Sequence, residues 1–519
     1  MWRRCSPLDR FEMTTHPDRR AVLGAGLWLG AFSMMPQMLR AQATEGGPAL
    51  GPAEPFSYDL LKELAAALSR QPYAEPEIPD AAVLEQIDYD HHNQIRFKEE
   101  DTLWRNQGPT SSVQPFFPGR YFRNPVRLYT VEHGMAREFP FALDLFDIPA
   151  DNPAKALTHT KGFAGFRVID AQSQRDWMAF LGAAYWRTSG YSGQFGLSVR
   201  GLAMDTAIAG GPEEFPNFTR FWLEPGQDGD ITVYALMESP RVTGAYRIAS
   251  HHQDGVVQDV SATLFLRGDV ERFGIAPMTS MFWYGKANHY LGPDWRPEIH
   301  DSDGLQILAG NGEQIWRPLN DPPRTMANTF FTPGVKGFGL MQRERNFAQY
   351  QDDGVFYEKR ASAWVEPTGD WGEGTVTLGE IPTQDEIHDN IVAFWQPAKP
   401  ARAGDRVDLA YRLSWLEDCP VPPVAARFIA TRIGVGGIPG QPRPVDEVKV
   451  VCDLESTGFE GLGREDGITV SVSPSRGSAA NEAVFPVVGQ DYWRTMFDLN
   501  FAELRADDDT PIDIRLSVK

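Results

Sequence analysis

The segment Val407-Asp-Leu-Ala-Tyr-Arg-Leu-Ser-Trp415 decides the fold, because its odd-numbered residues are all apolar. Successive side chains of a β-strand point to opposite faces of a sheet. This alternation therefore predicts a strand with one face on a core and the other in water. The same alternation recurs in Ile468–Val472 and in Ile512–Val518. Residues 406–519 are therefore predicted to form a small immunoglobulin-like β-sandwich.

The region before this segment is predicted to be a second, larger all-β unit. Residues 397–405 are rich in Pro, Ala and Gly, which is typical of a linker. Residues 52–396 contain short apolar runs broken by turns, such as Phe221–Leu223 and Ile231–Met237. Strands do not alternate regularly with long helices, which argues against a doubly wound sheet and predicts a large β-sandwich.

One helix is predicted near the start of the large sandwich. Ser57 is a suitable N-cap, and leucines at positions 60, 61, 64 and 68 follow with the spacing of a helical face. Gln71-Pro72 is expected to end the helix, because proline cannot continue the backbone hydrogen bonding.

The first 43 residues are predicted to be a Tat-type signal peptide that directs export to the periplasm. Arg19-Arg20 precede the apolar run Ala21–Met35, and Ala41-Gln-Ala43 supplies small residues at a cleavage spacing. The apolar run is too short to span a bilayer comfortably. An ordinary secretory signal and an uncleaved anchor remain as alternatives.

Charge and cysteine content exclude several classes of protein. The chain has 519 residues, with 49 basic and 70 acidic side chains and a net charge of −21, which argues against a nucleic-acid partner. The 3 cysteines form no CxxC pair, so no structural zinc site is predicted. Neither a cofactor nor a metal is expected. Removal of the signal would leave Cys419 and Cys452, which are equally compatible with a disulfide and with two buried thiols.

Two acidic clusters are the candidates for chemistry. They are Trp295-Arg-Pro-Glu-Ile-His-Asp-Ser-Asp-Gly304 and Ile381-Pro-Thr-Gln-Asp-Glu-Ile-His-Asp-Asn390. Each places carboxylates beside aromatic residues and a predicted strand, as in sugar sites, where rings stack on sugars and carboxylates handle protons. Acidic turn residues without a function are the alternative, and His300–Gly304 also fits a calcium loop or an Asx turn.

The same clusters carry a family resemblance, together with three upstream motifs. These motifs are Phe56-Ser-Tyr-Asp-Leu60, Tyr89-Asp-His-His-Asn-Gln-Ile-Arg-Phe97 and Phe116-Phe-Pro-Gly119. In this order they resemble the periplasmic glucan biosynthesis family (MdoG/OpgG and OpgD), from about residue 54 to the end of the chain. The twin arginine makes the chain more similar to the OpgD type. The resemblance implies a galactose mutarotase-like large sandwich followed by an immunoglobulin-like domain.

The resemblance also implies an activity, that of an inverting endo-β-1,2-glucanase. Its general acid would be Asp389, with His388 as the alternative proton donor. Its base would be Asp301, acting through a water and a substrate hydroxyl, with Asp303 in the same turn as the alternative. On chemistry and position alone, we add four expected substrate-binding residues: Trp283, Arg343, Tyr357 and Glu386.

Two other functions stay open. One is a non-catalytic glucan-binding or scaffolding partner of the membrane glucan synthase, and the other is a transglycosylase using the same site. The expected partner in each case is β-1,2-linked glucan, and a homodimer is also open.

Overall fold

The computed structural model describes most of the chain. The described residues are 48–75, 78–105, 107–108, 110–421, 426–438, 440–456, 458–505 and 510–519. The predicted signal peptide, residues 1–43, lies outside them.

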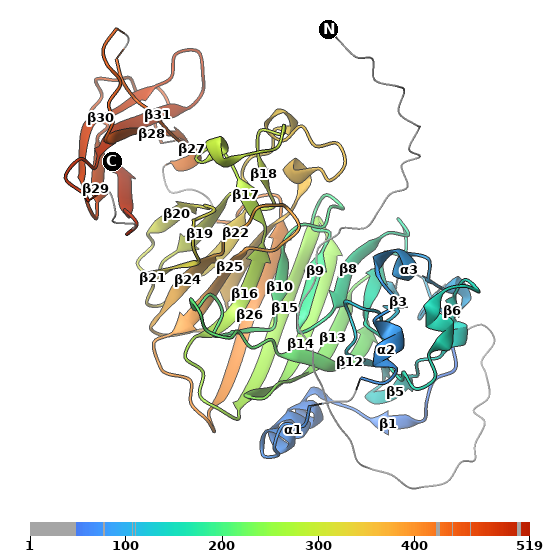
Figure 1. Cartoon of the computed structure of the whole chain (residues 1–519). Coiled ribbons are helices and arrows are strands. Elements are labelled where there is room, and N and C mark those ends of the chain that lie inside the picture. Colours follow the sequence, from blue (N-terminus) through green and yellow to red (C-terminus); the bar gives the residue numbers. More distant parts are fainter. Residues whose placement is uncertain are drawn as a thin grey trace, which may run out of the picture.

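The large unit is a sandwich of two wide sheets (Figure 1). The first sheet has 12 strands, in the order β1 (Ala53–Pro55), β5 (Met135–Phe139), β4 (Arg127–Glu132), β12 (Asn217–Pro225), β13 (Ile231–Glu238), β14 (Val242–Gln253), β15 (Gly255–Leu266), β26 (Arg406–Leu416), β23 (Ser362–Pro367), β22 (Gly337–Met341), β19 (Gly304–Leu308) and β20 (Gln314–Pro318).

The facing sheet has 10 strands. Their order is β21 (Met326–Phe331), β24 (Gly374–Glu380), β25 (Ile391–Pro397), β16 (Phe273–Ser280), β10 (Ser198–Arg200), β9 (Tyr185–Thr188), β8 (Asp176–Leu181), β7 (Gly165–Ile169) and β3 (Ser112–Phe116), with β11 (Leu202–Met204) beside β16. Two short pairs complete the unit: β17 (Phe282–Tyr284) with β18 (Ile299–His300), and β2 (Arg96–Phe97) with β6 (Phe146–Asp147).

The core lies between the two sheets and contains a buried polar junction. Trp186 of β9 and Trp415 of β26 both donate their indole N–H to the Gln258 side-chain oxygen of β15, each at 3.0 Å. All three side chains are buried. Since buried donors and acceptors are costly when unpaired, these bonds fix the register of one sheet against the other.

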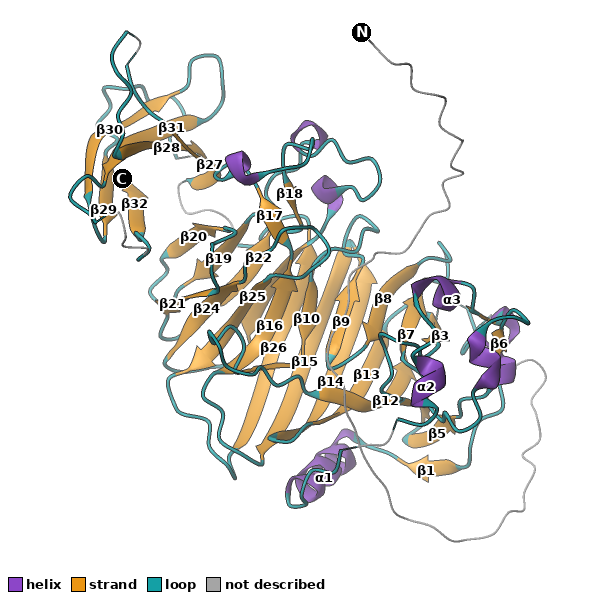
Figure 2. Cartoon of the chain, in the orientation of Figure 1, coloured by secondary structure: helices purple, strands orange, loops and turns teal. Residues whose placement is uncertain are grey.

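The helices lie outside the sheets (Figure 2). The predicted helix is confirmed as α1 (Tyr58–Ser69), with Ser57 accepting a hydrogen bond from Leu60 N. Leu61 and Ala65 of α1 pack on the outer face of the 12-stranded sheet. The other helices are short: α2 (Ala81–Leu84), α3 (Tyr89–Asn93), and the 3-10 turns η1 (Glu99–Asp101), η2 (Leu143–Leu145), η3 (Pro153–Ala156), η4 (His289–Leu291), η5 (Phe347–Gln349) and η6 (Tyr357–Lys359).

The domain boundary differs from the prediction at 397–405. Strand β26, which was expected to open the C-terminal domain, pairs with β15 from Val256↔Trp415 to Phe265↔Arg406, and with β23 on its other side. Segment 397–405 instead connects β25 and β26, which lie in the two facing sheets. Alternation in a sequence shows that a strand has one buried face, but it does not show which sheet the strand joins.

The small C-terminal sandwich begins after β26. Its four-stranded sheet has the order β27 (Arg427–Gly434), β28 (Glu447–Glu455), β31 (Trp493–Asn500) and β30 (Ser478–Pro486), and it faces the pair β29 (Val470–Pro474) and β32 (Ile514–Val518). The predicted all-β architecture of a large and a small sandwich is thus confirmed. Cys419 and Cys452 are free thiols, and burial raises the pKa of each to about 11.

Candidate functional site

The two acidic clusters meet at the end of strand β16. On one side, Asp301 N donates to Met281 O at 2.8 Å. On the other side, the Asn390 side chain accepts from Phe282 N at 2.8 Å and donates to Phe282 O at 2.9 Å. Clusters that are about 90 residues apart in the sequence are therefore attached to the same short segment, with Asp301 on one flank and Asp389, next to Asn390, on the other.

Asp389 is half-buried and is held by two hydroxyl groups. Tyr185 of β9 donates its O–H to Asp389 Oδ2 at 2.5 Å, and the Thr279 hydroxyl of β16 lies 3.5 Å from the same oxygen. Burial, reinforced by the charge of Asp389, raises the pKa of Tyr185 above its usual range. Tyr185 is therefore a permanent hydrogen-bond donor near neutral pH, and it fixes the orientation of the Asp389 carboxyl group.

Asp301 has a very different environment. Its side chain is fully buried and forms an ion pair with Arg360, which is also buried. The Arg360 guanidinium lies over the Tyr357 ring, 4.5 Å from the ring centre. Because an unpaired buried charge is very costly, Arg360 is the group that allows a carboxylate to exist at position 301.

Asp303, two residues further along, ties together the backbone of its own turn and the segment after β22. Its Oδ2 accepts the backbone N–H groups of Arg343 and Glu344, both at 3.0 Å. Burial raises the pKa of Asp303. The two aspartates of this turn are thus distinguished by their partners, a guanidinium for Asp301 and backbone N–H groups for Asp303.

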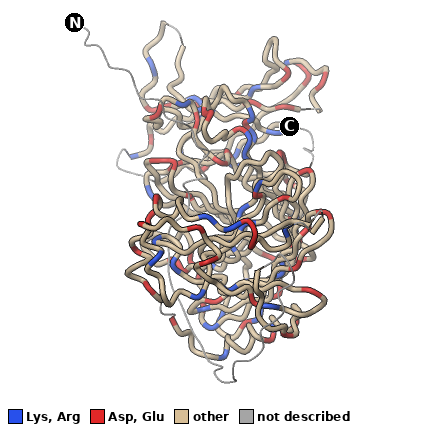
Figure 3. Tube along the Cα trace, turned by 90° about the vertical axis from the view of Figure 1, so that its right-hand side faces the viewer, with Lys and Arg blue, Asp and Glu red and all other residues tan. Residues whose placement is uncertain are grey.

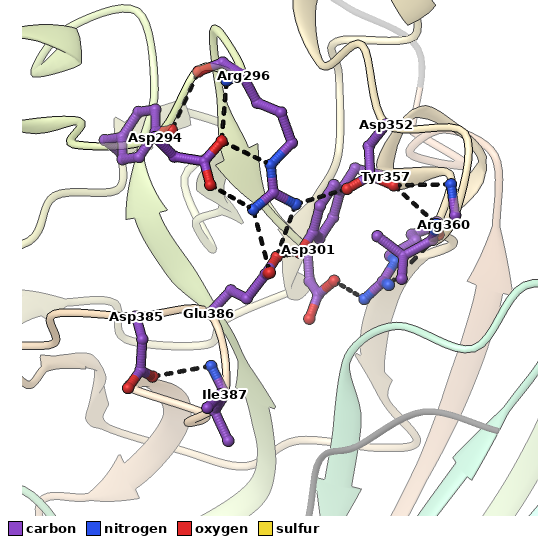
Figure 4. A network of polar contacts seen from close by, with 12 residues as sticks. Asp294, Arg296, Asp301, Asp352, Tyr357, Arg360, Asp385, Glu386 and Ile387 are labelled. Carbon is purple, nitrogen blue, oxygen red and sulfur yellow. Dashed lines mark hydrogen bonds and ion pairs between the residues drawn. The ribbon is translucent and has the colours of Figure 1, made fainter. Parts of the chain in front are cut away.

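A third set of contacts surrounds Arg296, whose guanidinium binds three carboxylates (Figure 4). It donates to Asp294 at 3.0 Å, to Asp352 at 2.6 Å, and to both oxygens of Glu386 at 3.0 and 3.1 Å. The three acids come from different loops, so one side chain joins the β17–β18, β22–β23 and β24–β25 connections. Burial disfavours the charged guanidinium, yet the three carboxylates raise the pKa of Arg296 overall.

The Arg296 set and the Asp301–Arg360 pair are neighbours. Tyr357 donates its O–H to Glu386, while its ring lies against Arg360. Figure 4 shows the two groups side by side. Tyr357 and Glu386, two of the four expected binding residues, therefore connect the Arg296 set with the Asp301–Arg360 pair. The Tyr357 side chain is fully buried, so it supports the site from within.

The other two expected binding residues lie differently. Trp283 is half-buried, with its ring edge-on to Tyr284 at 5.4 Å. Arg343 lies over the Trp316 ring at 3.5 Å and donates to Phe428 O of β27 in the small sandwich. The structure thus places the Arg343 side chain at the junction of the two sandwiches. Burial lowers its pKa to about 10.

Three residues that position the carboxylates were not among the predicted site residues. Arg296 was quoted within the first acidic cluster, and its location among acidic residues was an available signal. Tyr185 and Arg360 lie 204 and 59 positions from the aspartates they contact, and no local pattern connects them. Only the tertiary fold places them in the site.

A hollow of about 820 Å³ lies elsewhere, beside Arg241 and Glu271. Glu271 lies just before β16 begins, whereas the loops of the two candidate carboxylates are bound to the segment that follows the last residue of β16. The hollow is therefore at the opposite end of that strand.

Acidic and basic residues are interspersed over the molecule in the view of Figure 3.

Comparison with known proteins identifies the family of the chain. Residues 56–519 match the family model described as "Periplasmic glucan biosynthesis protein, MdoG". The chain belongs to this family. Family membership gives the chain a role in glucan biosynthesis and places it in the periplasm.

Curated relatives of the family are similar over nearly their full length. "Glucans biosynthesis protein D 2" of Ralstonia nicotianae is 45% identical, over 98% of this chain and 95% of that protein. "Probable glucans biosynthesis protein D" of Shewanella oneidensis is 43% identical, over 92% of this chain and 89% of that protein.

Among solved structures, the galactose mutarotase related enzyme of Lactobacillus acidophilus aligns with 50% of this chain and 94% of its own. The identity is 11% and the TM-score is 0.23, which is too low to support an argument about the site.

We expect the folded state of this protein to be stabilised by Arg296. In Arg296→Met the three carboxylates lose their shared cation, and we expect a loss of about 2–3 kcal/mol at pH 7. This is below the full penalty for breaking a buried pair because the carboxylates are partly exposed. Thermal unfolding of the wild type and of Arg296→Met measures the difference in their free energy of unfolding. Arg296→Lys, which keeps the charge but not the planar fork, should be intermediate.

The difference should also depend on pH. Hydrogen bonds from Arg296 lower the pKa of Asp294; for Asp352, burial acts to raise the pKa, but the Val355 N–H and Arg296 outweigh it. Groups with a depressed folded-state pKa stabilise the fold above their unfolded value, about 4, and lose that contribution as the pH falls through the folded value. The gap between wild type and Arg296→Met should therefore shrink below about pH 4. A constant gap would contradict this role.

Proposed function

We propose that this glucan biosynthesis protein is an inverting endo-β-1,2-glucanase that cleaves the glucan backbone in the periplasm. The observation that carries the proposal is the pair of carboxylates flanking the end of β16, one half-buried and hydroxyl-bound, the other buried and paired with arginine. Two carboxyl groups in contrasting environments are what a glycosidase needs for an acid and a base.

Asp389 acts as the general acid in this proposal. It gives its proton to the glycosidic oxygen as the bond from that oxygen to the anomeric carbon breaks. Its partial exposure lets it meet a sugar, and Tyr185 holds its Oδ2 in place. His388 is exposed, and within the part of the chain that the structure describes no hydroxyl holds its side chain as Tyr185 holds Asp389.

Asp301 acts as the base. A water attacks the anomeric carbon from the opposite face and passes its proton to a substrate hydroxyl, whose own proton goes to Asp301. Asp301 is fully buried in the free protein, so the attacking water does not contact it, and substrate binding has to expose its carboxylate to the hydroxyl that completes the relay. The guanidinium partner supports Asp301 over Asp303 as the ionised acceptor.

Asp389→Asn should strongly slow hydrolysis of linear β-1,2-glucan, because the amide cannot give up a proton to the leaving oxygen. General acid catalysis typically contributes 10²–10⁴-fold, so we expect at least a roughly hundredfold loss in kcat. Thin-layer chromatography of overnight digests provides the measurement. Asp385→Asn is the matched control, since Asp385 lies in the same loop and, among the described residues, its carboxylate accepts a bond from Ile387 N alone. Native-rate product release by Asp389→Asn would overturn the assignment.

Tyr185→Phe should lower kcat about tenfold and leave KM nearly unchanged, because only the hydroxyl that orients the acid is lost. Steady-state kinetics on linear β-1,2-glucan tests this. Tyr234→Phe is the control, since Tyr234 donates to Glu224 at 2.8 Å, well away in the 12-stranded sheet. Equal effects of the two variants would remove Tyr185 from the mechanism.

A non-catalytic glucan-binding partner of the membrane glucan synthase is the second candidate. The observation in its favour is the neutralisation of Asp301 by Arg360 in a fully buried position, which also suits a purely structural carboxylate. Intact polymer after incubation, with clear retention of the protein on a glucan affinity gel, would select this candidate. Oligosaccharide products that are longer than the substrate would instead indicate a transglycosylase.

Export by the twin-arginine route is part of the proposal and rests on Arg19-Arg20 before the apolar run. Replacement of both arginines by lysine should leave the precursor in the cytoplasm, as measured by fractionation and immunoblotting. A Sec-type leader without the arginine pair serves as the control for export. Unchanged periplasmic protein in the double-lysine variant would contradict this route.

A further inference from the structure

Large apolar side chains are exposed on two of the three loops that Arg296 joins, the β17–β18 and β24–β25 loops. On the β17–β18 loop the side chain of Trp295 is 74% exposed, and on the β24–β25 loop that of Ile387 is 51% exposed. Tyr290 and Leu291 of the same β17–β18 loop are also exposed. Exposed apolar groups of this size cost solubility, so their concentration beside one site indicates a ligand surface.

The backbone that carries Trp295 is held rigidly on both sides. Arg296 N donates to Asp294 Oδ1 at 3.0 Å across the tryptophan, and Tyr284 donates its O–H to Arg296 O at 3.0 Å. One residue further on, Pro297 O accepts from His289 Nδ1 at 2.9 Å. An exposed ring on a fixed backbone is pre-organised, so a ligand that stacks on it orders little additional chain.

This rigid loop is connected to the proposed general acid. The Arg296 guanidinium donates hydrogen bonds to both carboxylate oxygens of Glu386. Glu386 is followed by the exposed Ile387 and His388 and then by Asp389. The Arg296–Glu386 ion pair thus joins the loop that carries Trp295 to the loop that carries Asp389.

We propose that Trp295, with Ile387 on the loop that the Arg296–Glu386 pair joins to its own, forms a binding subsite for a glucosyl unit of the glucan chain away from the cleaved bond. The inference rests on the proposed function, which it deepens by naming a residue that selects long substrates. The apolar face of a β-linked glucose stacks on an aromatic ring, while the neighbouring carboxylates accept bonds from its hydroxyls.

Local charge supports a neutral sugar as the occupant. The Arg296 guanidinium is surrounded by three carboxylates, so the surroundings of Trp295 are net negative. A phosphate or an anionic lipid headgroup would be repelled there. A second copy of this chain is the other occupant for which an exposed apolar surface is suited, and the test distinguishes it.

The test is the affinity for long linear β-1,2-glucan, measured by isothermal titration calorimetry on the full-length Asp389→Asn protein with and without Trp295→Ala. We expect Trp295→Ala to weaken binding roughly tenfold, as for the loss of one stacked ring, and Trp295→Phe to restore most of the affinity. Phe331→Ala is the matched control, since the side chain of Phe331 is 67% exposed at the last residue of β21. The loop that carries Ile387 begins after Glu380, which pairs with Met326 at the other end of β21. In the active protein, Trp295→Ala should raise KM for long glucans and leave kcat on short oligosaccharides unchanged.

The outcomes separate this inference from the proposed function. Hydrolysis by the wild type together with equal glucan affinity in Trp295→Ala overturns only the subsite. Absence of hydrolysis in the wild type, with weaker glucan binding by Trp295→Ala, overturns the glucanase and retains the subsite. Light scattering of the same samples completes the test: a dimer that dissociates on Trp295→Ala with unchanged glucan affinity assigns the surface to a second copy and overturns the proposal.

Discussion

The arrangement of the site depends on the hydrogen bonds at the end of strand β16. On one side of this segment, the Met281 carbonyl accepts a hydrogen bond from Asp301 N. On the other side, Phe282 N donates to the side-chain amide of Asn390. Asn390 also donates to Ile381 O, so its amide closes the loop that carries Asp389. Because these bonds are buried and directional, they fix two distant loops with little freedom. These bonds therefore hold the loops of Asp301 and Asp389 on the two flanks of one short segment.

Buried arginines make this concentration of acids compatible with a stable fold. Arg360 neutralises Asp301, and Arg296 forms ion pairs with three carboxylates from three loops, which it offsets in part. Guanidinium groups suit this task because their planar donors match several carboxylates at once. Tyr357 connects the two arginines by contacting Arg360 and donating to Glu386. In the proposed reaction the network would hold the base in place while the acid stays accessible to sugar.

The fold could be predicted from the sequence where local periodicity determines structure. The helix after Ser57 and the all-β character follow directly from spacing. The domain boundary was wrong because the alternation in β26 reveals a buried face but not its partner strands, and a Pro- and Gly-rich connection between two sheets resembles a linker. In the site, the acidic clusters could be recognised from composition and from the family resemblance. The contacts of Tyr185 and Arg360 could not, since they arise only from long-range packing.

The central claim is that Asp389 and Asp301 act on opposite faces of one glycosidic bond. Proton NMR of the first products released from linear β-1,2-glucan tests it most directly, because the anomeric signal is read before mutarotation. A newly formed α-anomer at the reducing end is the expected result, since a water attacking opposite the leaving oxygen inverts the β-linkage. An initial β-anomer would require a covalent intermediate or same-face attack and would contradict the account.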